Sequence, residues 1–331
     1  MTARRVVVTG GSGFIGTHVV AALATAGHEV RNFDVEPPRD PSFSGLWTNL
    51  DVRDEQGCAR AIVDFAPSWV VHLAARTDLD ERVRLSGYTA NTDGVRNLVR
   101  AVQAAGVERV VFASSSLVFT PGVTPRHDRD YSPSTMYGMS KVVGEEIVRA
   151  ASLVAEWCFV RPTSIWGPWF GTPYRDFFVA VAKGRYLHAW GRHPSKSYGY
   201  VGNAVHQLLA LLSAMKDDVH GKAFWLADYD PIDLYEWAQA IARDTRARDV
   251  RVVPYALLKA AAIGGDILQR TGWSNPPLTS FRLHNIVEDA EYDTTALEGI
   301  VGPLPFSWRE GVRLTADWLS QQAVLGSDRP R

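Results

Sequence analysis

The segment 4–16 of the chain, RRVVVTGGSGFIG, decides the fold. Its first part, Arg4–Thr9, is a continuous apolar run ended by glycines, which predicts a buried β-strand. From Phe14, apolar residues recur at helical spacing as far as Ala26, and Gly27 then supplies a helix end signal. Glycines between a strand and a helix let the backbone turn sharply and approach a phosphate closely. Because the helix N-terminus adds free N–H groups, the segment is a candidate binding loop for a pyrophosphate.

Short β-branched runs and helical patterns alternate through the first half of the chain. Further strands are predicted at Glu29–Phe33, Trp69–Leu73 and Glu108–Ala113, and further helices at Glu55–Phe65, Ala90–Ala105 and Tyr137–Ala151. This alternation, with strands that are apolar on both faces, is typical of a parallel sheet with helices on each side. We therefore predict an α/β fold in which a Rossmann-type, doubly wound parallel sheet precedes a smaller, mixed C-terminal domain.

The pattern changes after about residue 165, where proline, glycine and tryptophan cluster at Trp166–Pro173. Helical patterns follow at Arg175–Lys183 and Ala204–Met215, and irregular segments are predicted around 186–200 and 270–283. We expect an NAD-type dinucleotide-binding domain at 1–165 and a substrate-binding domain at 166–331, with the chain near 196–226 returning to the first domain.

Tryptophan is unevenly distributed along the chain. Nine of the eleven tryptophans lie at or after Trp157. Most of them are expected to fill the core of the smaller domain, because large aromatic side chains contribute much buried area. Trp166, Trp169 and Trp190 are the candidates for shaping a substrate pocket.

The composition argues against several classes of protein. With 35 basic and 36 acidic residues, the formal charge of −1 gives no global electrostatic reason to expect a nucleic acid or an anionic membrane as partner. The two cysteines, Cys58 and Cys158, match neither a disulfide framework nor a metal-ligand spacing. The sequence shows no leader-like start and no apolar run of about 18 residues. We expect a cytoplasmic protein that takes a small-molecule substrate and no metal.

An acidic residue ends the second predicted strand. Asp34 follows Phe33 and lies eighteen residues beyond Gly16. A carboxylate at this position accepts hydrogen bonds from both hydroxyls of an adenosine ribose and repels a 2′-phosphate. Asp34 therefore favours NAD over NADP, although a solvated loop aspartate is the simpler alternative for any single Asp.

Tyr137 and Lys141 lie four residues apart at the start of a predicted helix, so their side chains share one face. A tyrosine base that works near pH 7 needs a pKa roughly three below its usual value, and a Lys ammonium and an oxidised nicotinamide both favour the phenolate. Tyr137 would then remove the proton of an alcohol while a hydride leaves. The hydroxyls of Ser114–Ser116 follow the strand that ends at Ala113, at the sheet edge where ligands bind in open α/β sheets.

In this order along the chain, the motifs resemble the extended short-chain dehydrogenase/reductase superfamily, and within it the NAD-dependent sugar-nucleotide epimerase/dehydratase family. Segment 9–16 is similar to the family's TGGxGFIG loop, Asp51-Val52 to the pair that meets the adenine, and Leu73-Ala74-Ala75 to the loop beside the cofactor. The resemblance implies NAD bound by Gly10, Gly13, Phe14, Ile15, Gly16, Asp34, Asp51, Val52, Leu73, Ala74, Ala75, Asn91, Tyr137 and Lys141. It also implies Ser115, counted back from Val118-Phe119, as the catalytic hydroxyl beside the Tyr137 and Lys141 pair.

The chain departs from the family pattern where the substrate is expected. Ser115-Ser116-Leu117 stands where dehydratases that make 4-keto-6-deoxy sugars have Thr-Asp-Glu, which disfavours elimination of water. Ser164 replaces an asparagine that contacts the substrate, and Lys196 replaces a phosphate-binding arginine and so loses its bidentate fork. The candidate substrate residues are Ser116, Ser164, Arg175, Lys196 and Arg282, with ordinary surface arginines as the alternative for Arg175 and Arg282.

Our leading hypothesis is an NAD-dependent epimerase that inverts a nucleotide-activated sugar, at C4, by transient oxidation to a keto-sugar. Tyr137 acts as the base, Lys141 lowers its pKa and Ser115 binds the reacting oxygen. The alternative is an NAD(P)-dependent ketoreductase or dehydrogenase that acts on a keto-sugar nucleotide or on another secondary alcohol, such as a polyketide or a steroid. A non-catalytic NAD-sensing protein is a third possibility, which the retained Tyr137 and Lys141 disfavour. The resemblance also implies a homodimer formed by the helices at 90–105 and 137–151.

Overall fold

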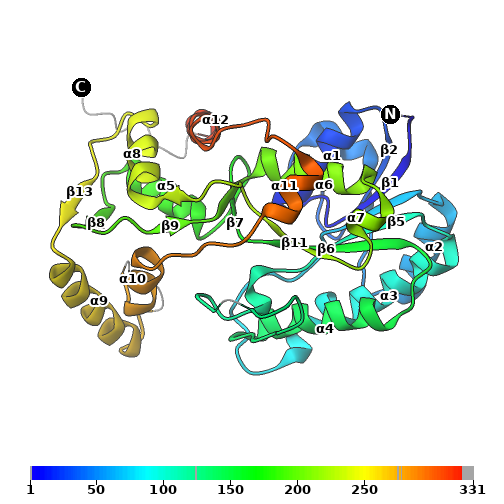
Figure 1. Cartoon of the computed structure of the whole chain (residues 1–331), viewed down its shortest axis with the longest axis horizontal. Coiled ribbons are helices and arrows are strands. Elements are labelled where there is room, and N and C mark those ends of the chain that lie inside the picture. Colours follow the sequence, from blue (N-terminus) through cyan, green and yellow to red (C-terminus); the bar gives the residue numbers. More distant parts are fainter. Residues whose placement is uncertain (1, 124, 274–275, 277, 323–331) are drawn as a thin grey trace. The chain divides into compact units, whose positions relative to one another are not determined.

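A computed structural model describes residues 2–123, 125–273, 276 and 278–322 of the chain (Figure 1). The described residues form two compact units. The first unit comprises residues 2–165, 201–229 and 293–305, and the second comprises residues 166–200, 230–292 and 306–322. Two segments that lie late in the sequence therefore belong to the first unit.

The first unit is built on a parallel sheet of seven strands. The strands are β1 (Arg5–Thr9), β2 (Glu29–Asp34), β3 (Trp47–Asn49), β4 (Trp69–His72), β5 (Arg109–Ala113), β6 (Glu156–Pro162) and β11 (Ala223–Leu226). Their order is β11-β6-β5-β4-β1-β2-β3, and each neighbouring pair is parallel. The chain leaves β1 toward one edge and later returns to the other, which is the doubly wound arrangement. The predicted Rossmann-type sheet is confirmed.

Helices cover both faces of this sheet (Figure 1). On one face α2 (Glu55–Phe65) packs against α3 (Thr89–Ala105), and α3 packs against α4 (Met136–Ala150). On the other face α6 (Val201–Ser213) packs against α1 (Phe14–Thr25) and α11 (Thr295–Val301). The short helix α7 (Lys216–Val219) contacts β6. The 3₁₀ turns η1 (Pro41–Leu46), η2 (Leu85–Tyr88) and η3 (Ser116–Val118) lie in the connections.

The sequence patterns placed most of these elements within one or two residues of their observed ends. The helix at Glu55–Phe65 has the predicted bounds, whereas α6 begins at Val201, three residues before the predicted start. Strands β3, β6 and β11 were not predicted from the sequence. Strand β3 has only three residues, which is too short to show an alternation of apolar and polar residues. Strand β6 has a short apolar run between Glu156 and Arg161, which also gives no clear periodic signal.

The second unit combines short strand pairs with longer helices. Its strands are β8 (Leu187–Ala189), β9 (Ser195–Lys196), β10 (Tyr198–Tyr200), β12 (Ile232–Asp233) and β13 (Arg251–Val253), and β7 (Ser164–Trp166) leads into it. Its helices are α5 (Tyr174–Ala182), α8 (Leu234–Asp244), α9 (Tyr255–Arg270), α10 (Ser280–Val287) and α12 (Trp308–Gln321). The segments predicted to be irregular therefore contain structure, because strands of two or three residues are too short to show a period. The end of the second segment forms the start of α10, and residues 274–275 and 277 lie outside the described part of the chain.

Aromatic rings fill the core of the second unit. Trp166 and Trp237 are fully buried, and their ring centroids lie 5.3 Å apart. Phe178 packs against both rings. Of the other two tryptophans that were candidates for a substrate pocket, Trp169 packs against Trp318 and Trp190 is 76% exposed. Within the described residues, no helix is both long enough and apolar enough to cross a membrane.

Candidate active site

The glycine loop between β1 and α1 is closely packed against the end of β4. Gly10 has a φ of +72°, and a Cβ atom added to it would lie 2.5 Å from the backbone nitrogen of Ala74. An added Cβ on Gly16 would collide with the carbonyl oxygen of Gly10. Both positions therefore require glycine. The N-cap of α1, Gly13, has an extended backbone and makes no side-chain cap hydrogen bond, and Phe14 and Ile15 form the first turn of the helix behind it.

Asp34 ends β2 directly beside this loop. Its Oδ2 accepts a hydrogen bond from the Ser12 backbone N–H at 2.9 Å, and its Oδ1 accepts one from Glu36 N–H at 3.0 Å. The half-buried carboxylate is thus fixed at the end of the strand by backbone donors. The guanidinium of Arg39 donates to the carbonyl oxygen of Ser12 at 3.0 Å. Sequence reasoning missed this cation at the glycine loop, because Arg39 lies in a polar connection without a periodic pattern.

The other predicted cofactor residues divide into two groups. Asp51 forms an ion pair with Arg53, whose hydrogen bond holds the pKa of that carboxyl below its usual value. Its neighbour Val52 is buried against Gly94 of α3, where any side chain would collide with it. Leu73, Ala74 and Ala75 follow β4 and lie against the glycine loop through Gly10. The structure therefore brings the loop, Asp34 and residues 73–75 to the carboxyl ends of β1, β2 and β4.

Asn91 on α3 connects the loop after β4 to helix α4. Its Nδ2 donates to the carbonyl oxygen of Arg76 at 2.9 Å and to Ser140 Oγ at 2.8 Å, and its Oδ1 accepts from Arg76 N–H at 2.8 Å. Ser140 Oγ in turn donates to the carbonyl oxygen of Tyr137 at 2.6 Å. Asn91 is completely buried and holds the start of α4 in place. The hydrogen bonds of the Asn91 side chain are therefore made to other residues of the protein.

Ser115, Tyr137 and Lys141 come together at the carboxyl end of β5. Thr135 caps α4 by accepting a hydrogen bond from Gly138 N–H at 3.0 Å, which places Tyr137 in the first turn. Ser115 Oγ accepts a hydrogen bond from Leu117 N–H at 3.1 Å and lies near enough to the Tyr137 hydroxyl to lower its pKa. The Lys141 ammonium donates to the carbonyl oxygen of Ala113 at 2.9 Å and lies 6.0 Å from the centroid of the Tyr137 ring. All three side chains are buried.

Burial decides the pKa values of these groups in the protein alone. Burial raises the pKa of Tyr137 to about 12, and the Ser115 hydrogen bond acts in the opposite direction. Burial lowers the pKa of Lys141 to about 8, while the carboxylate of Glu145 raises it. Desolvation of the phenolate is the largest influence on Tyr137 in the protein alone, and it acts against the lowering of the pKa that was predicted from Lys141.

A buried charge network on α4 is the part of this region that sequence reasoning missed. Glu145, one turn beyond Lys141, is 1% exposed and accepts two hydrogen bonds from Arg161 on β6, at 2.9 and 2.7 Å. It also accepts from Ser114 Oγ and Tyr131 Oη, each at 2.6 Å. The spacing of four residues from Lys141 was an available signal, since both side chains must share one helix face.

His72, the last residue of β4, is buried in the same part of the first unit as Lys141 and Glu145. Its Nδ1 lies 2.6 Å from Thr9 Oγ1, and burial, followed by the nearby Lys141, lowers its pKa to about 3. Its Nε2 has no hydrogen-bond partner among the described residues. The imidazole is therefore neutral, and it lines a small cavity together with Lys141 and Glu145.

The predicted substrate residues are distributed over both units. Ser116 in η3 and Ser164 in β7 are half-buried residues of the first unit. Arg175 and Arg282 are exposed on α5 and α10 of the second unit, and Arg282 Nη1 donates to the carbonyl oxygen of Pro276 at 2.9 Å. Lys196 is only 3% exposed, and its ammonium donates to the carbonyl oxygens of Asn285, at 2.8 Å, and Glu288. Its charge therefore stabilises the C-terminal end of α10.

Three known proteins illustrate what the chain resembles. The model of the NAD dependent epimerase/dehydratase family matches residues 6–227. The 3 beta-hydroxysteroid dehydrogenase/Delta 5-->4-isomerase of Mycobacterium tuberculosis is 32% identical over 252 residues, which cover 72% of this chain and 68% of that protein. The N-acetyl-alpha-D-glucosaminyl-diphospho-ditrans,octacis-undecaprenol 4-epimerase of Escherichia coli O157:H7 is 25% identical, covering 95% of this chain and 94% of that protein. The fold is similar to that of the UDP-glucose 4-epimerase of Thermus thermophilus in complex with NAD, with a TM-score of 0.69, 22% identity and coverage of 96% and 99% of the two chains.

Proposed function

The chain belongs to the NAD-dependent epimerase/dehydratase family, and from this premise we propose that it oxidises a secondary alcohol with Tyr137 as the base. The observation that supports this proposal is the buried constellation of Ser115, Tyr137 and Lys141 at the carboxyl end of β5. Oxidation of an alcohol needs one group that takes the hydroxyl proton and a second that accepts the hydride. NAD is the hydride acceptor of this family.

The glycine loop fits the pyrophosphate of NAD. Gly10 and Gly16 have no room for side chains, because the loop packs against itself and against Leu73-Ala74, and this keeps the turn between β1 and α1 as tight as a pyrophosphate-binding loop requires. The N-terminus of α1, which follows this loop directly, supplies the positive end of a helix dipole. We propose that Asp34 binds the adenosine ribose and that Val52 and residues 73–75 lie along the cofactor. When bound, the oxidised nicotinamide supplies a positive charge that favours the phenolate of Tyr137.

Three side chains divide the proton chemistry among themselves. Ser115 donates a hydrogen bond to the reacting oxygen and holds it against Tyr137. Tyr137 removes the hydroxyl proton as the carbon–hydrogen bond breaks, so that a ketone forms and the proton resides on the phenol oxygen. The Lys141 ammonium, oriented by the Ala113 carbonyl, stabilises the phenolate that precedes this step. Reduction of a ketone uses the same contacts in reverse.

We propose a lipophilic secondary alcohol, of the hydroxysteroid class, as the substrate. The ammonium of Lys196, at the position where the family places a phosphate-binding arginine, is buried and bound to two carbonyl oxygens of the α10 end. Ser164 supplies a short hydroxyl where many relatives have an amide. Both features weaken a diphosphate site. The 32% identity to a hydroxysteroid dehydrogenase supports the same choice.

Epimerisation of a nucleotide sugar at C4 is the second candidate. The 4-epimerase of E. coli is similar along 95% of this chain, whereas the steroid dehydrogenase covers 72% of it. In an epimerase, the keto-sugar turns over and receives the hydride on its other face. The acid pair of the dehydratases is absent at Ser116-Leu117, so we do not propose elimination of water.

A paired assay separates the two candidates. The purified protein is incubated with NAD and either a 3β-hydroxysteroid or UDP-glucose, and NADH absorbance and sugar products are followed. Net NADH with an equal amount of ketone supports the dehydrogenase, whereas UDP-galactose without net NADH supports the epimerase. Tyr137→Phe must abolish the reaction, and Tyr235→Phe, in the second unit, is the matched control. Full activity of the Tyr137 variant would overturn the proposed base.

We further propose that the first unit binds NAD and that the second unit recognises the substrate. The homodimer is proposed from the family resemblance alone. The apolar stripe formed by Val95, Leu98, Val99 and Val102 on α3 is buried inside the first unit and so is already covered. Sedimentation at micromolar concentration tests the dimer, and a monomer would refute it. A cytoplasmic location remains a prediction.

A further inference from the structure

Helix α9 has an apolar face that no described residue covers. Its inner face, at Leu258, Ala262 and Gly265, is buried against α10 in a small apolar core. On the opposite side Leu257 is 62% exposed and Ile267 is 56% exposed. An apolar outer face on a helix whose inner face is already buried is a candidate interaction surface.

The outer face is continuous along the helix. Exposed or half-buried apolar residues recur three and four positions apart, at Leu257, Ala260, Ala261, Gly264, Ile267 and Leu268, with Ile263 beside them. Residues at this spacing lie above one another on an α-helix. The three charged residues of the helix, Lys259, Asp266 and Arg270, lie together in the stripe between the inner and outer faces. No charged residue therefore interrupts the outer face.

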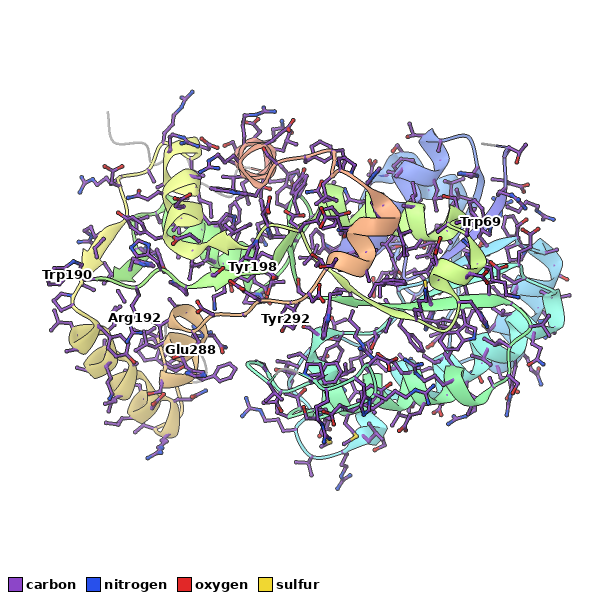
Figure 2. The ribbon with its side chains drawn as sticks, in the orientation of Figure 1. Trp69, Trp190, Arg192, Tyr198, Glu288 and Tyr292 are labelled. Atoms are coloured by element: carbon purple, nitrogen blue, oxygen red, sulfur yellow. The ribbon has the colours of Figure 1, made fainter. Side chains whose placement is uncertain are left out.

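Large, exposed aromatic side chains lie in the segments next to α9. Trp273 follows α9 and is 51% exposed, and Phe281, at the start of α10, is 71% exposed. Ser280 N–H donates to Asp266 Oδ1 at 3.0 Å, which fixes the start of α10 beside the middle of α9. At the other end Trp190 N–H donates to the carbonyl oxygen of Val253, two residues before α9. Figure 2 shows Trp190 and Arg192 beside the first turn of α9.

The segment of chain that contains this face is rich in basic residues, two of which, Lys259 and Arg270, lie on α9 itself beside the outer face. Between the end of α8 and the end of α10 the chain has six basic and two acidic residues, although the whole chain has a formal charge of −1. The basic residues are Arg246, Arg248, Arg251, Lys259, Arg270 and Arg282, and all are exposed. One of the two acids, Asp266, is bound to the Ser280 N–H. Acidic residues return only at Glu288, beyond the C-terminal end of α10.

We propose that the outer face of α9, with Trp190, Trp273 and Phe281, binds the surface of an anionic lipid bilayer. An apolar helix face with exposed aromatic residues and a basic margin is the arrangement of interfacial helices, in which the apolar side enters the acyl boundary and the cations meet lipid phosphates. A second copy of this face would bring like charges together across a symmetric contact. The lipid surface therefore fits the charge better than self-association does.

Binding to vesicles tests the proposal. The full chain is floated with vesicles of phosphatidylcholine alone and with vesicles that also contain phosphatidylglycerol, at low and high salt. We expect association with the anionic vesicles that weakens with salt. The double variant Ile267→Gln/Leu268→Gln should lose most of the association. The variant Lys259→Gln should weaken it about fivefold on anionic vesicles only, the effect of one cation near such a surface.

Matched controls keep the result interpretable. Val154 and Met215 are 87% and 73% exposed in the first unit, so Val154→Gln/Met215→Gln removes equivalent apolar surface elsewhere and should leave binding unchanged. Circular dichroism confirms that each variant is folded. Absence of association with anionic vesicles overturns the proposal, as does a double variant of α9 that binds like the original chain. Sedimentation that shows self-association abolished by Ile267→Gln/Leu268→Gln would assign the face to a second copy and also overturn it.

Discussion

Replacement of Glu145 by glutamine is predicted to destabilise the first unit severely. Glutamine keeps the size of the side chain but removes its charge. The guanidinium of Arg161, 3% exposed, would then lack the carboxylate that binds it at 2.7 and 2.9 Å. Three aromatic rings, of Phe119, Tyr131 and Trp225, surround that guanidinium within 6 Å, so water cannot easily replace the lost partner.

The size of the effect follows from the loss of one member of a buried ion pair. Removing one partner and leaving the other charge buried costs about 3–5 kcal/mol, because the remaining ion has lost both water and its counter-charge. Glu145 also accepts the hydroxyl hydrogens of Ser114 and Tyr131, which a glutamine oxygen can satisfy only in part. We therefore expect a loss of at least about 3 kcal/mol in the free energy of unfolding.

Urea unfolding followed by circular dichroism measures this loss. Glu146→Gln is the matched control, because Glu146 is the next residue of α4 and is exposed, and it should change stability by less than about 0.5 kcal/mol. The double variant Glu145→Met/Arg161→Met should recover most of the loss, since it removes both charges. A loss below about 1 kcal/mol for Glu145→Gln would refute the reasoning, as it would place this pair among weakly coupled surface ion pairs.

Three further predictions concern single positions. Asp34→Ala should weaken NAD binding and raise the ratio of NADP to NAD use, because the acid that repels a 2′-phosphate is removed; an unchanged ratio in steady-state kinetics would contradict this role. Lys196→Met should destabilise the second unit by about 1–3 kcal/mol through the uncapped carbonyls of α10, and the KM for the accepted substrate should stay the same; a large rise in KM with unchanged stability would restore Lys196 as a substrate ligand. Burial lowers the pKa of Lys141 to about 8, so the unfolded chain keeps this proton up to a higher pH than the folded chain does. The free energy of unfolding therefore rises as the pH increases from 8 toward 10.5, the usual pKa of lysine. Relative to Lys141→Met, the original chain should therefore gain about 3 kcal/mol of unfolding free energy between pH 7 and pH 10.5, measured by urea unfolding; no gain would mean that the ammonium is not desolvated.

The parts of the site that the sequence predicted are those encoded within a few neighbouring residues. The glycine loop lies between β1 and α1, and a Cβ at Gly10, Gly11 or Gly16 would collide with the segment after β4, with Asn32 of β2 or with the loop itself. Tyr137 and Lys141 share a helix face by spacing alone. Ser115 was chosen over Ser116 from its distance to Val118-Phe119, and this choice stays a prediction; Ser115 lies at the start of η3 and lowers the pKa of Tyr137.

Contacts between distant segments were not accessible in the same way. Glu145 and Arg161 are only sixteen residues apart, but they lie on a helix and on a strand whose relative position is set by the whole sheet. Lys196 matched a phosphate ligand in one motif, yet its ammonium is bound to carbonyls that lie 89 and 92 residues later in the chain. The residue type in a motif determines what a side chain can bind, whereas the fold determines which partner lies within hydrogen-bond distance.

The surface around helix α9 could not be predicted from the sequence either, because pattern and net charge describe averages and not single faces. The apolar stretch around it is indistinguishable in the sequence from a core helix, because the pattern does not reveal which faces other elements will cover. The balanced charge of the whole chain argued against a membrane partner, but it is a sum over surfaces that point in different directions. Six cations gathered between α8 and the end of α10 are hidden in that sum by acidic residues elsewhere. A net charge near zero therefore constrains the long-range field of the protein and leaves open the chemistry of any single face.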